Sequence, residues 1–181
     1  MVYLSGFDTE SMRLLGRQTD RFLQPGEYFV GDASHRVCTL LGSCVSVTLW
    51  NPERRIGAMS HFVLATRAGT LHDTHVELDA RYGDEALQLM LRELERFEIA
   101  PAQCHAKVFG GGNMFPAQHM SCIADVGRRN GEAAREMLHA HGIHVVSESL
   151  FGVGHRQIVF DIEEGDVWSR QVRPCFSADD A

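Results

Sequence analysis

Positively charged residues are few in this sequence compared with negatively charged ones. Its 24 acidic residues outnumber its 17 basic ones, Lys107 is the only lysine, and the formal net charge is −7. A protein that binds nucleic acid presents a basic face to neutralise the phosphate groups. The charge balance therefore argues against a nucleic-acid partner.

Long apolar runs and a leader peptide are also missing. No apolar stretch approaches the roughly 20 residues that a membrane-spanning helix needs. The first residues lack the basic start and the apolar run of a secretory signal. We therefore expect no direct membrane insertion and a cytoplasmic location.

Cysteine patterns typical of disulfide frameworks and zinc ribbons are absent too. The five cysteines are an odd number and include no Cys-x-x-Cys pair. His72 and His75 have a spacing that could serve a metal, but the sequence offers no third ligand near them. We expect a reducing compartment, no metal and no cofactor.

The composition that remains is that of one soluble globular domain. Hydrophobic residues make up 44% and charged residues 23% of the chain, which are average values, and 181 residues suffice for a single core. We expect the domain to span residues 24–173. Residues 1–23 would be an N-terminal extension outside the core, and residues 174–181 a polar C-terminal tail.

Strand-like runs rich in β-branched residues surround a corner of small residues. Residues 37–41 and 45–50 are short, apolar and bounded by turn residues, and residues 56–64 read as a returning strand. Cys44 follows the corner and begins the second run. An antiparallel return would bring His61 back beside Cys44, although 17 positions (61 − 44) separate them.

A cysteine beside a histidine is the minimal unit of thiol catalysis, because the imidazole can take the thiol proton. The competing interpretation is structural, since unpaired cysteine is among the most buried residue types. Spacing alone leaves both interpretations open for Cys44 and His61.

The rest of the chain predicts two helices and further strands. Apolar residues recur at helical spacing in 79–98 and again in 126–140, and strand-like runs occupy 26–31, 104–109, 143–148, 156–162 and 166–172. Strands at both ends with helices between them predict an α/β fold: a layered sandwich of mixed or antiparallel β-sheets with helices packed outside.

Glycines 110–112 follow one of these strands but do not form a phosphate-binding motif, because neither the GxxxxGK[ST] nor the GxGxxG pattern is present. They predict a tight turn near the active face that leaves room for a substrate, or a purely structural turn. Residues 128–130, at the start of the second helix, either organise that face by hydrogen bonding or form a solvated cap.

Four segments in a fixed order carry a resemblance to a known family. They are residues 41–45 (LGSCV), 57–61 (GAMSH), 107–115 (KVFGGGNMF) and 126–130 (VGRRN). Together they resemble the CheD family, the chemoreceptor glutamine deamidases of bacterial chemotaxis, over about residues 24–168. The resemblance implies the same layered fold.

The resemblance also implies the site and the partners. By position, Cys44 corresponds to the nucleophile, His61 to the histidine that activates it, and Thr39 to the third catalytic residue. The stretch between Thr39 and Cys44 is one residue shorter than in some members. The implied substrate is glutamine on the cytoplasmic helical bundles of chemoreceptors, and the implied protein partner is a CheC-type phosphatase.

The mechanism that follows is hydrolytic deamidation of glutamine to glutamate through a cysteine thioester, with backbone N–H groups near Ser43 and Cys44 as oxyanion donors. Two alternatives stay open. A thiol protease or transglutaminase would use the same pair of residues, and a non-enzymatic adaptor would only bind the phosphatase.

Overall fold

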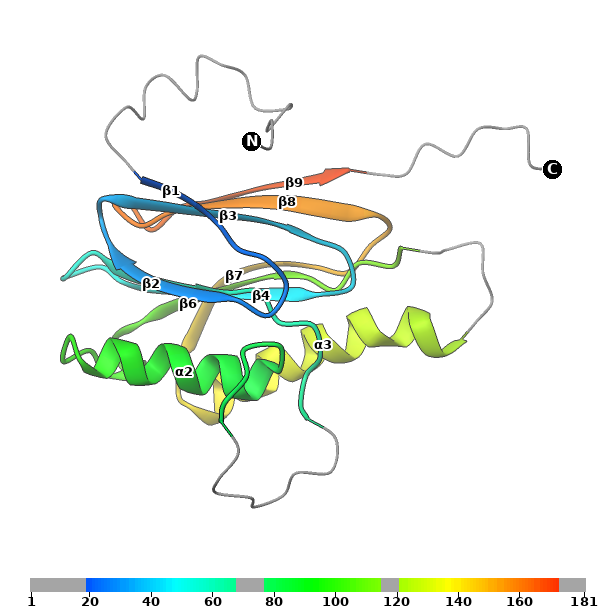
Figure 1. The fold of residues 1–181 in the computed structure, drawn as a ribbon, viewed down its shortest axis with the longest axis horizontal. Helices are drawn as coiled ribbons and strands as arrows, with labels where there is room; N and C mark the ends of the chain where they lie inside the picture. The colour runs from blue at the N-terminus through cyan, green and yellow to red at the C-terminus, as the bar shows by residue number, and fades with distance from the viewer. Residues whose placement is uncertain (1–18, 68–76, 115–120, 173–181) are drawn as a thin grey trace, which may run out of the picture.

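Two β-sheets face each other, and two helices cover one of them in this computed structural model (Figure 1). The structure describes residues 19–67, 77–114 and 121–172, with only the backbone described for 121–125. The elements in chain order are β1 (Thr19–Phe22), β2 (Tyr28–Asp32), β3 (His35–Leu41), β4 (Val45–Asn51), β5 (Ile56–Ser60), α2 (Gly83–Glu95), η1 (Pro101–Gln103), β6 (His105–Gly110), α3 (Ser121–Ala140), β7 (His144–Leu150), β8 (His155–Asp161) and β9 (Val167–Val172).

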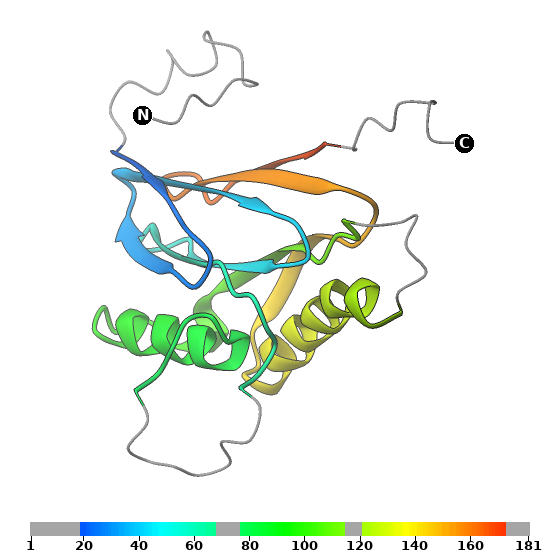
Figure 2. The ribbon, with the colours of Figure 1, turned by 45° about the vertical axis from the view of Figure 1, so that its right-hand side comes forward.

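The two sheets are mixed. The four-stranded sheet has the order β1-β3-β8-β9, and the five-stranded sheet has the order β2-β5-β4-β6-β7. Only β1 with β3 and β6 with β7 pair in parallel among the named strands. Helices α2 and α3 pack on the outer face of the five-stranded sheet, as the turned view shows (Figure 2). The predicted layered α/β sandwich is confirmed.

Side-chain alternation along β4 separates two cores. Val45, Val47 and Leu49 point to the helices, where they join the larger cluster of buried residues. Cys44 and Trp50 point the other way and pack against the cluster between the two sheets. Because successive strand residues face opposite sides, every even-numbered residue from 44 to 50 faces the inter-sheet layer.

Helix α2 begins at Gly83, four residues after the predicted start at residue 79. Tyr82 is extended, and the Glu85 carboxylate accepts a hydrogen bond from the Asp79 backbone N–H at 2.7 Å. The predicted apolar stripe is confirmed, with Ala86, Leu87, Met90 and Leu94 buried.

Among the described residues, no helix combines the length and the apolar character needed to cross a membrane.

Strand β1 is not predicted by the pattern of apolar residues in the sequence. Its side chains in Thr19–Phe22 are all exposed, so no apolar alternation marks the strand. Backbone hydrogen bonds hold it, among them Thr19 N–H to Ser34 O at 2.7 Å and Leu23 N–H to Cys38 O at 2.9 Å. Leu23 then enters the inter-sheet core. The last part of the expected extension, 1–23, thus joins the sheet, while the domain boundary itself stays a prediction.

The inter-sheet core yields a stability prediction. Phe160 is fully buried there, so Phe160→Ala should lower the free energy of unfolding by about 3–5 kcal/mol. Phe97→Ala is the matched control, because Phe97 is 42% exposed, and its loss should cost under about 1 kcal/mol. Urea unfolding followed by circular dichroism measures both, and equal losses would contradict this account of the core.

Candidate active site

Cys44 lies at the corner where the chain passes from one sheet to the other. Strand β3 belongs to the four-stranded sheet and β4 to the five-stranded sheet, so the residues between them cross the sandwich. Two backbone hydrogen bonds hold the corner: Gly111 N–H donates to Cys44 O at 2.9 Å, and Gly112 N–H donates to Gly42 O at 2.8 Å. The Cys44 side chain is half-buried at the edge of the inter-sheet core.

The triple glycine allows backbones to pack closely behind this corner. A Cβ on Gly110 would collide with Cys44 O, and the residue has a φ of 118°, which other residues rarely adopt. A Cβ on Gly111 would lie 2.6 Å from Gly127 O on helix α3. These contacts favour the structural interpretation of the glycines over the one that leaves room for a substrate.

His61 lies on the same face of the five-stranded sheet as Cys44. An antiparallel bridge pairs Val45 with Phe62, which exchange backbone hydrogen bonds of 3.1 and 3.0 Å. Residues on either side of that bridge point to the opposite face from the bridged pair. Cys44 and His61 therefore occupy diagonal positions that both face the four-stranded sheet, where such neighbours are within reach of long side chains.

Thr39 reaches the histidine from the opposite sheet. Its Oγ1 lies 2.8 Å from His61 Nδ1 and 2.7 Å from Leu23 O. A hydroxyl has one hydrogen to donate. A carbonyl oxygen can only accept that hydrogen, so the Thr39 hydroxyl donates to Leu23 O and accepts from the N–H at Nδ1. The hydrogen-bond pattern thereby assigns the proton of neutral His61 to Nδ1.

This tautomer leaves Nε2 of His61 with a free lone pair. Nε2 is buried and has no hydrogen-bond partner among the described residues. The only other buried side-chain atom in that condition within the described ranges is Ser46 Oγ, and Ser46 lies directly opposite His61 across the same strand pair. Ser46 was not predicted to lie at the site. The available signal was its position two residues after Cys44 in a strand, which puts both side chains on the same face.

Burial sets the charge states of the pair. It lowers the pKa of His61, more than the Leu23 carbonyl and the Glu27 charge raise it. Burial also raises the pKa of the Cys44 thiol, which its own backbone N–H partly offsets. At neutral pH both groups are therefore in their neutral forms, as a thiol and an imidazole that can accept its proton. Burial raises the pKa of the Cys38 and Cys104 thiols to about 11.

Backbone N–H groups at the corner are available to a ligand. Within the part of the chain that the structure describes, the N–H groups of Ser43 and Cys44 donate to no backbone carbonyl, and the Cys44 N–H interacts with its own thiol. Unpaired donors beside a nucleophile are what an oxyanion hole requires.

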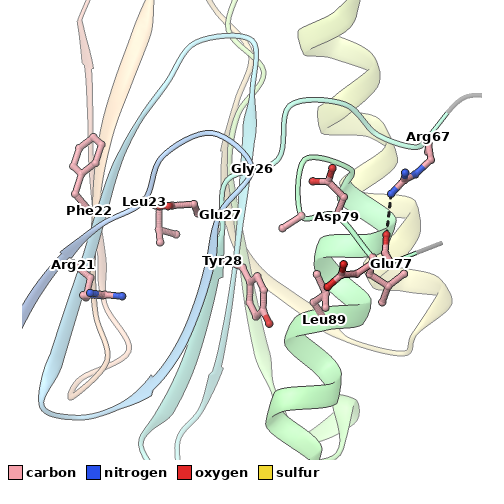
Figure 3. A pocket seen from close by; sticks show the side chains of 12 residues that line it. Arg21, Phe22, Leu23, Gly26, Glu27, Tyr28, Arg67, Glu77, Asp79 and Leu89 are labelled. Carbon is pink, nitrogen blue, oxygen red and sulfur yellow. Dashed lines mark hydrogen bonds between the residues drawn. The ribbon is translucent and has the colours of Figure 1, made fainter. Parts of the chain in front are cut away.

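A described cavity lies beside the segment that holds His61. It measures about 690 Å³, and Figure 3 shows Tyr28 and Leu89 facing each other across it, with a hydrogen bond from Arg67 to the Glu77 backbone at its rim. Neither Cys44 nor His61 lines this cavity. It adjoins the site through Leu23, whose carbonyl accepts the Thr39 hydroxyl, and through Gly26 and Glu27, which pair with the His61 backbone.

The described residues contain no group of three or more histidine, cysteine or acidic side chains arranged to hold a metal ion. His72 and His75, whose spacing raised that question, lie outside the described residues. The side chain of Cys122 and the whole of Cys175 lie outside them as well.

Comparisons with known proteins agree on one family. The family model described as CheD chemotactic sensory transduction matches residues 64–171. A protein of Albidiferax ferrireducens named "Probable chemoreceptor glutamine deamidase CheD 2" is 63% identical over 155 residues, which cover 86% of this chain and 88% of that protein. A protein of Dechloromonas aromatica with the same name and the number 3 is 41% identical, over 81% of this chain and 84% of its own.

These matches cover most of both chains at identities well above those of unrelated proteins. The shared region in the Albidiferax protein spans more of the chain than the family model, whose match begins after His61. The chain belongs to the CheD family.

Proposed function

We propose that this protein is a protein-glutamine glutaminase that deamidates glutamine side chains on chemoreceptors. The relatives bear the name chemoreceptor glutamine deamidase. The observation that carries the proposal for this chain is the hydrogen bond from His61 Nδ1–H to Thr39, because it leaves a buried, unpartnered Nε2 on the face of the sheet that also carries the Cys44 thiol.

In the first half of the reaction His61 acts as a base and then as an acid. Nε2 takes the thiol proton while Cys44 Sγ attacks the side-chain carbonyl carbon of the glutamine. The N–H groups of Ser43 and Cys44 stabilise the oxyanion of the tetrahedral intermediate. His61 returns the proton to the departing nitrogen, the C–N bond breaks, ammonia leaves, and a thioester joins the substrate to Cys44.

In the second half water replaces ammonia. Nε2 takes a proton from water as the water oxygen attacks the thioester carbonyl, and the C–S bond breaks to release glutamate. The proton then returns to the Cys44 sulfur. Thr39 holds the imidazole in one tautomer through both halves, so that Nε2 is the atom that exchanges protons.

The substrate proposed from the relatives' names is glutamine on chemoreceptors, and the family resemblance implies that these glutamines lie on the cytoplasmic helical bundles. A cytoplasmic location follows from that substrate. A CheC-type phosphatase stays a predicted partner that rests on the family resemblance. The same dyad could cut peptide bonds, so the products decide: ammonia without a new peptide terminus identifies deamidation.

The direct experiment is to incubate the protein with receptor cytoplasmic fragments and to measure ammonia release and Gln-to-Glu conversion by mass spectrometry. Cys44→Ala and Cys44→Ser should both lose nearly all activity, because a hydroxyl ionises far less than a thiol at neutral pH. Cys104→Ala is the control, since this buried thiol lies outside the site. Substantial deamidation by either Cys44 variant would exclude Cys44 as the nucleophile.

Replacing Thr39 tests the tautomer. Thr39→Val keeps the shape but removes the acceptor for Nδ1–H, and kcat should fall by roughly 10²-fold as general-base catalysis is impaired. Thr39→Ser should restore most of the activity. Thr48→Val serves as the matched control, because Thr48 is equally buried on β4 and its hydroxyl bonds only to Lys107 O at 3.4 Å. Equal losses at positions 39 and 48 would remove Thr39 from the mechanism.

The lowered pKa of His61 predicts the acid side of the pH profile. The base must be neutral, so kcat/KM should fall as pH decreases through the His61 pKa, which lies below the ordinary histidine value of 6.5. More than half of the maximal kcat/KM should thus remain at pH 6.5. Circular dichroism at each pH checks that the protein stays folded, and an acid limb centred above that pH would contradict the assignment.

A further inference from the structure

Helix α3 approaches the Cys44 corner more closely than side chains normally allow. A Cβ on Gly127 would lie 2.7 Å from Gly111 O, so the helix backbone lies against the glycine turn that supports the corner. Asn130, one turn further along α3, is buried. Its side chain reaches between the beginning of β4 and the chain that follows β5.

The Asn130 amide joins the two chain segments that carry the reacting groups. Nδ2 donates to Ser43 O at 3.2 Å and to Val63 O at 2.8 Å. An amide nitrogen has two hydrogens, so both are used. The last paired residues are Val45 and Phe62, and the two acceptors belong to residues two positions before Val45 and one position after Phe62. The side chain therefore continues the connection between the strands at the point where their backbone pairing ends.

We propose that Asn130 is a positioning residue for catalysis, an inference that rests on the proposed roles of Cys44 and His61. The bond to Val63 O holds the segment that follows His61. The bond to Ser43 O fixes the peptide unit between Ser43 and Cys44. A trans peptide is planar and its N–H points opposite to its C=O, so Asn130 also aims the Cys44 N–H, a proposed oxyanion donor.

The chemistry of the acceptors requires an amide at this position. Two carbonyl oxygens need donors, and a buried acceptor without one is destabilised. Aspartate has the shape of asparagine but would set a carboxylate against both carbonyls. Asn130→Asp and Asn130→Ala therefore both remove the connection, the first with the volume kept and the second with the volume lost.

Alkylation of Cys44 by iodoacetamide tests the proposal without any receptor. Thiolate is the nucleophile, so the rate at neutral pH reports proton transfer to His61. Asn130→Ala should slow this rate by at least about 10-fold, since a misplacement of roughly 1 Å can cost 10²-fold. In a His61→Gln background, where no base remains to be positioned, the same change should alter the rate less than about 2-fold.

Deamidation kinetics give the second measurement. Asn130→Ala should lower kcat on receptor fragments by at least about 10-fold and leave KM within about 3-fold, because Asn130 touches the reacting segments and not the substrate. Met137→Ala is the control on the same helix. Met137 packs on the larger core through an apolar side chain that cannot donate to Ser43 O or Val63 O, so its loss should lower the melting temperature and leave both rates unchanged.

Each outcome decides the proposal. Wild-type alkylation in a folded Asn130 variant would overturn it, and so would an equal slowing in the presence and absence of His61. Unfolding of both Asn130 variants would overturn it as well, since the residue would then act in folding alone. Failure of the wild type to deamidate receptors would refute the proposed function, while the dependence of alkylation on Asn130 and His61 would still test this inference.

Discussion

The site depends on one hydrogen bond that spans the sandwich, from His61 Nδ1–H on the five-stranded sheet to Thr39 Oγ1 on the four-stranded sheet. In the proposed mechanism each sheet supplies part of the catalytic group: one sheet carries the imidazole and the thiol, and the other carries the acceptor that fixes the proton. The inter-sheet core, with Phe160 and Ile158 at its centre, holds the sheets at the separation that the bond needs. Packing of the inter-sheet core thereby stabilises the hydrogen bond that fixes the tautomer of His61.

Around this bond the fold gathers a second group of constraints on the corner at Cys44. The glycine turn behind it and helix α3 approach to backbone contact, and Asn130 joins the segments on either side. The corner that carries the proposed nucleophile is therefore held by the backbone of the glycine turn and by the Asn130 side chain from α3, and the Cys44 side chain remains half-buried. The glycine turn and Asn130 bond to backbone carbonyl oxygens of the corner and leave the Cys44 thiol without a bond to either.

Local patterns predicted most of the fold. Short runs rich in apolar and β-branched residues marked β3, β4, β8 and β9, and helical spacing marked α2 and α3. An antiparallel return to Cys44 was expected, and the observed bridge between Val45 and Phe62 puts Cys44 and His61 on a common face. What local patterns could not supply were contacts between layers. Thr39 entered through the family resemblance, since its partner lies across the sandwich, and Ser46 was missed. Strand β1 was missed because its four side chains are all exposed, so no apolar pattern marks it.

The carbonyl of Leu23 gives the upstream segment an unexpected importance. It accepts the Thr39 hydroxyl, and a hydroxyl without that acceptor could turn and donate to Nδ1 instead. The imidazole would then carry its proton on Nε2, the nitrogen that must be unprotonated to accept the thiol proton in the proposed mechanism. The recognisable family pattern begins at about residue 24. A protein that began there would keep Cys44, His61 and Thr39 but would lose Leu23 O, the acceptor that orients the Thr39 hydroxyl. The proposed catalytic unit therefore has to include Leu23, because its carbonyl determines which nitrogen of His61 carries the proton.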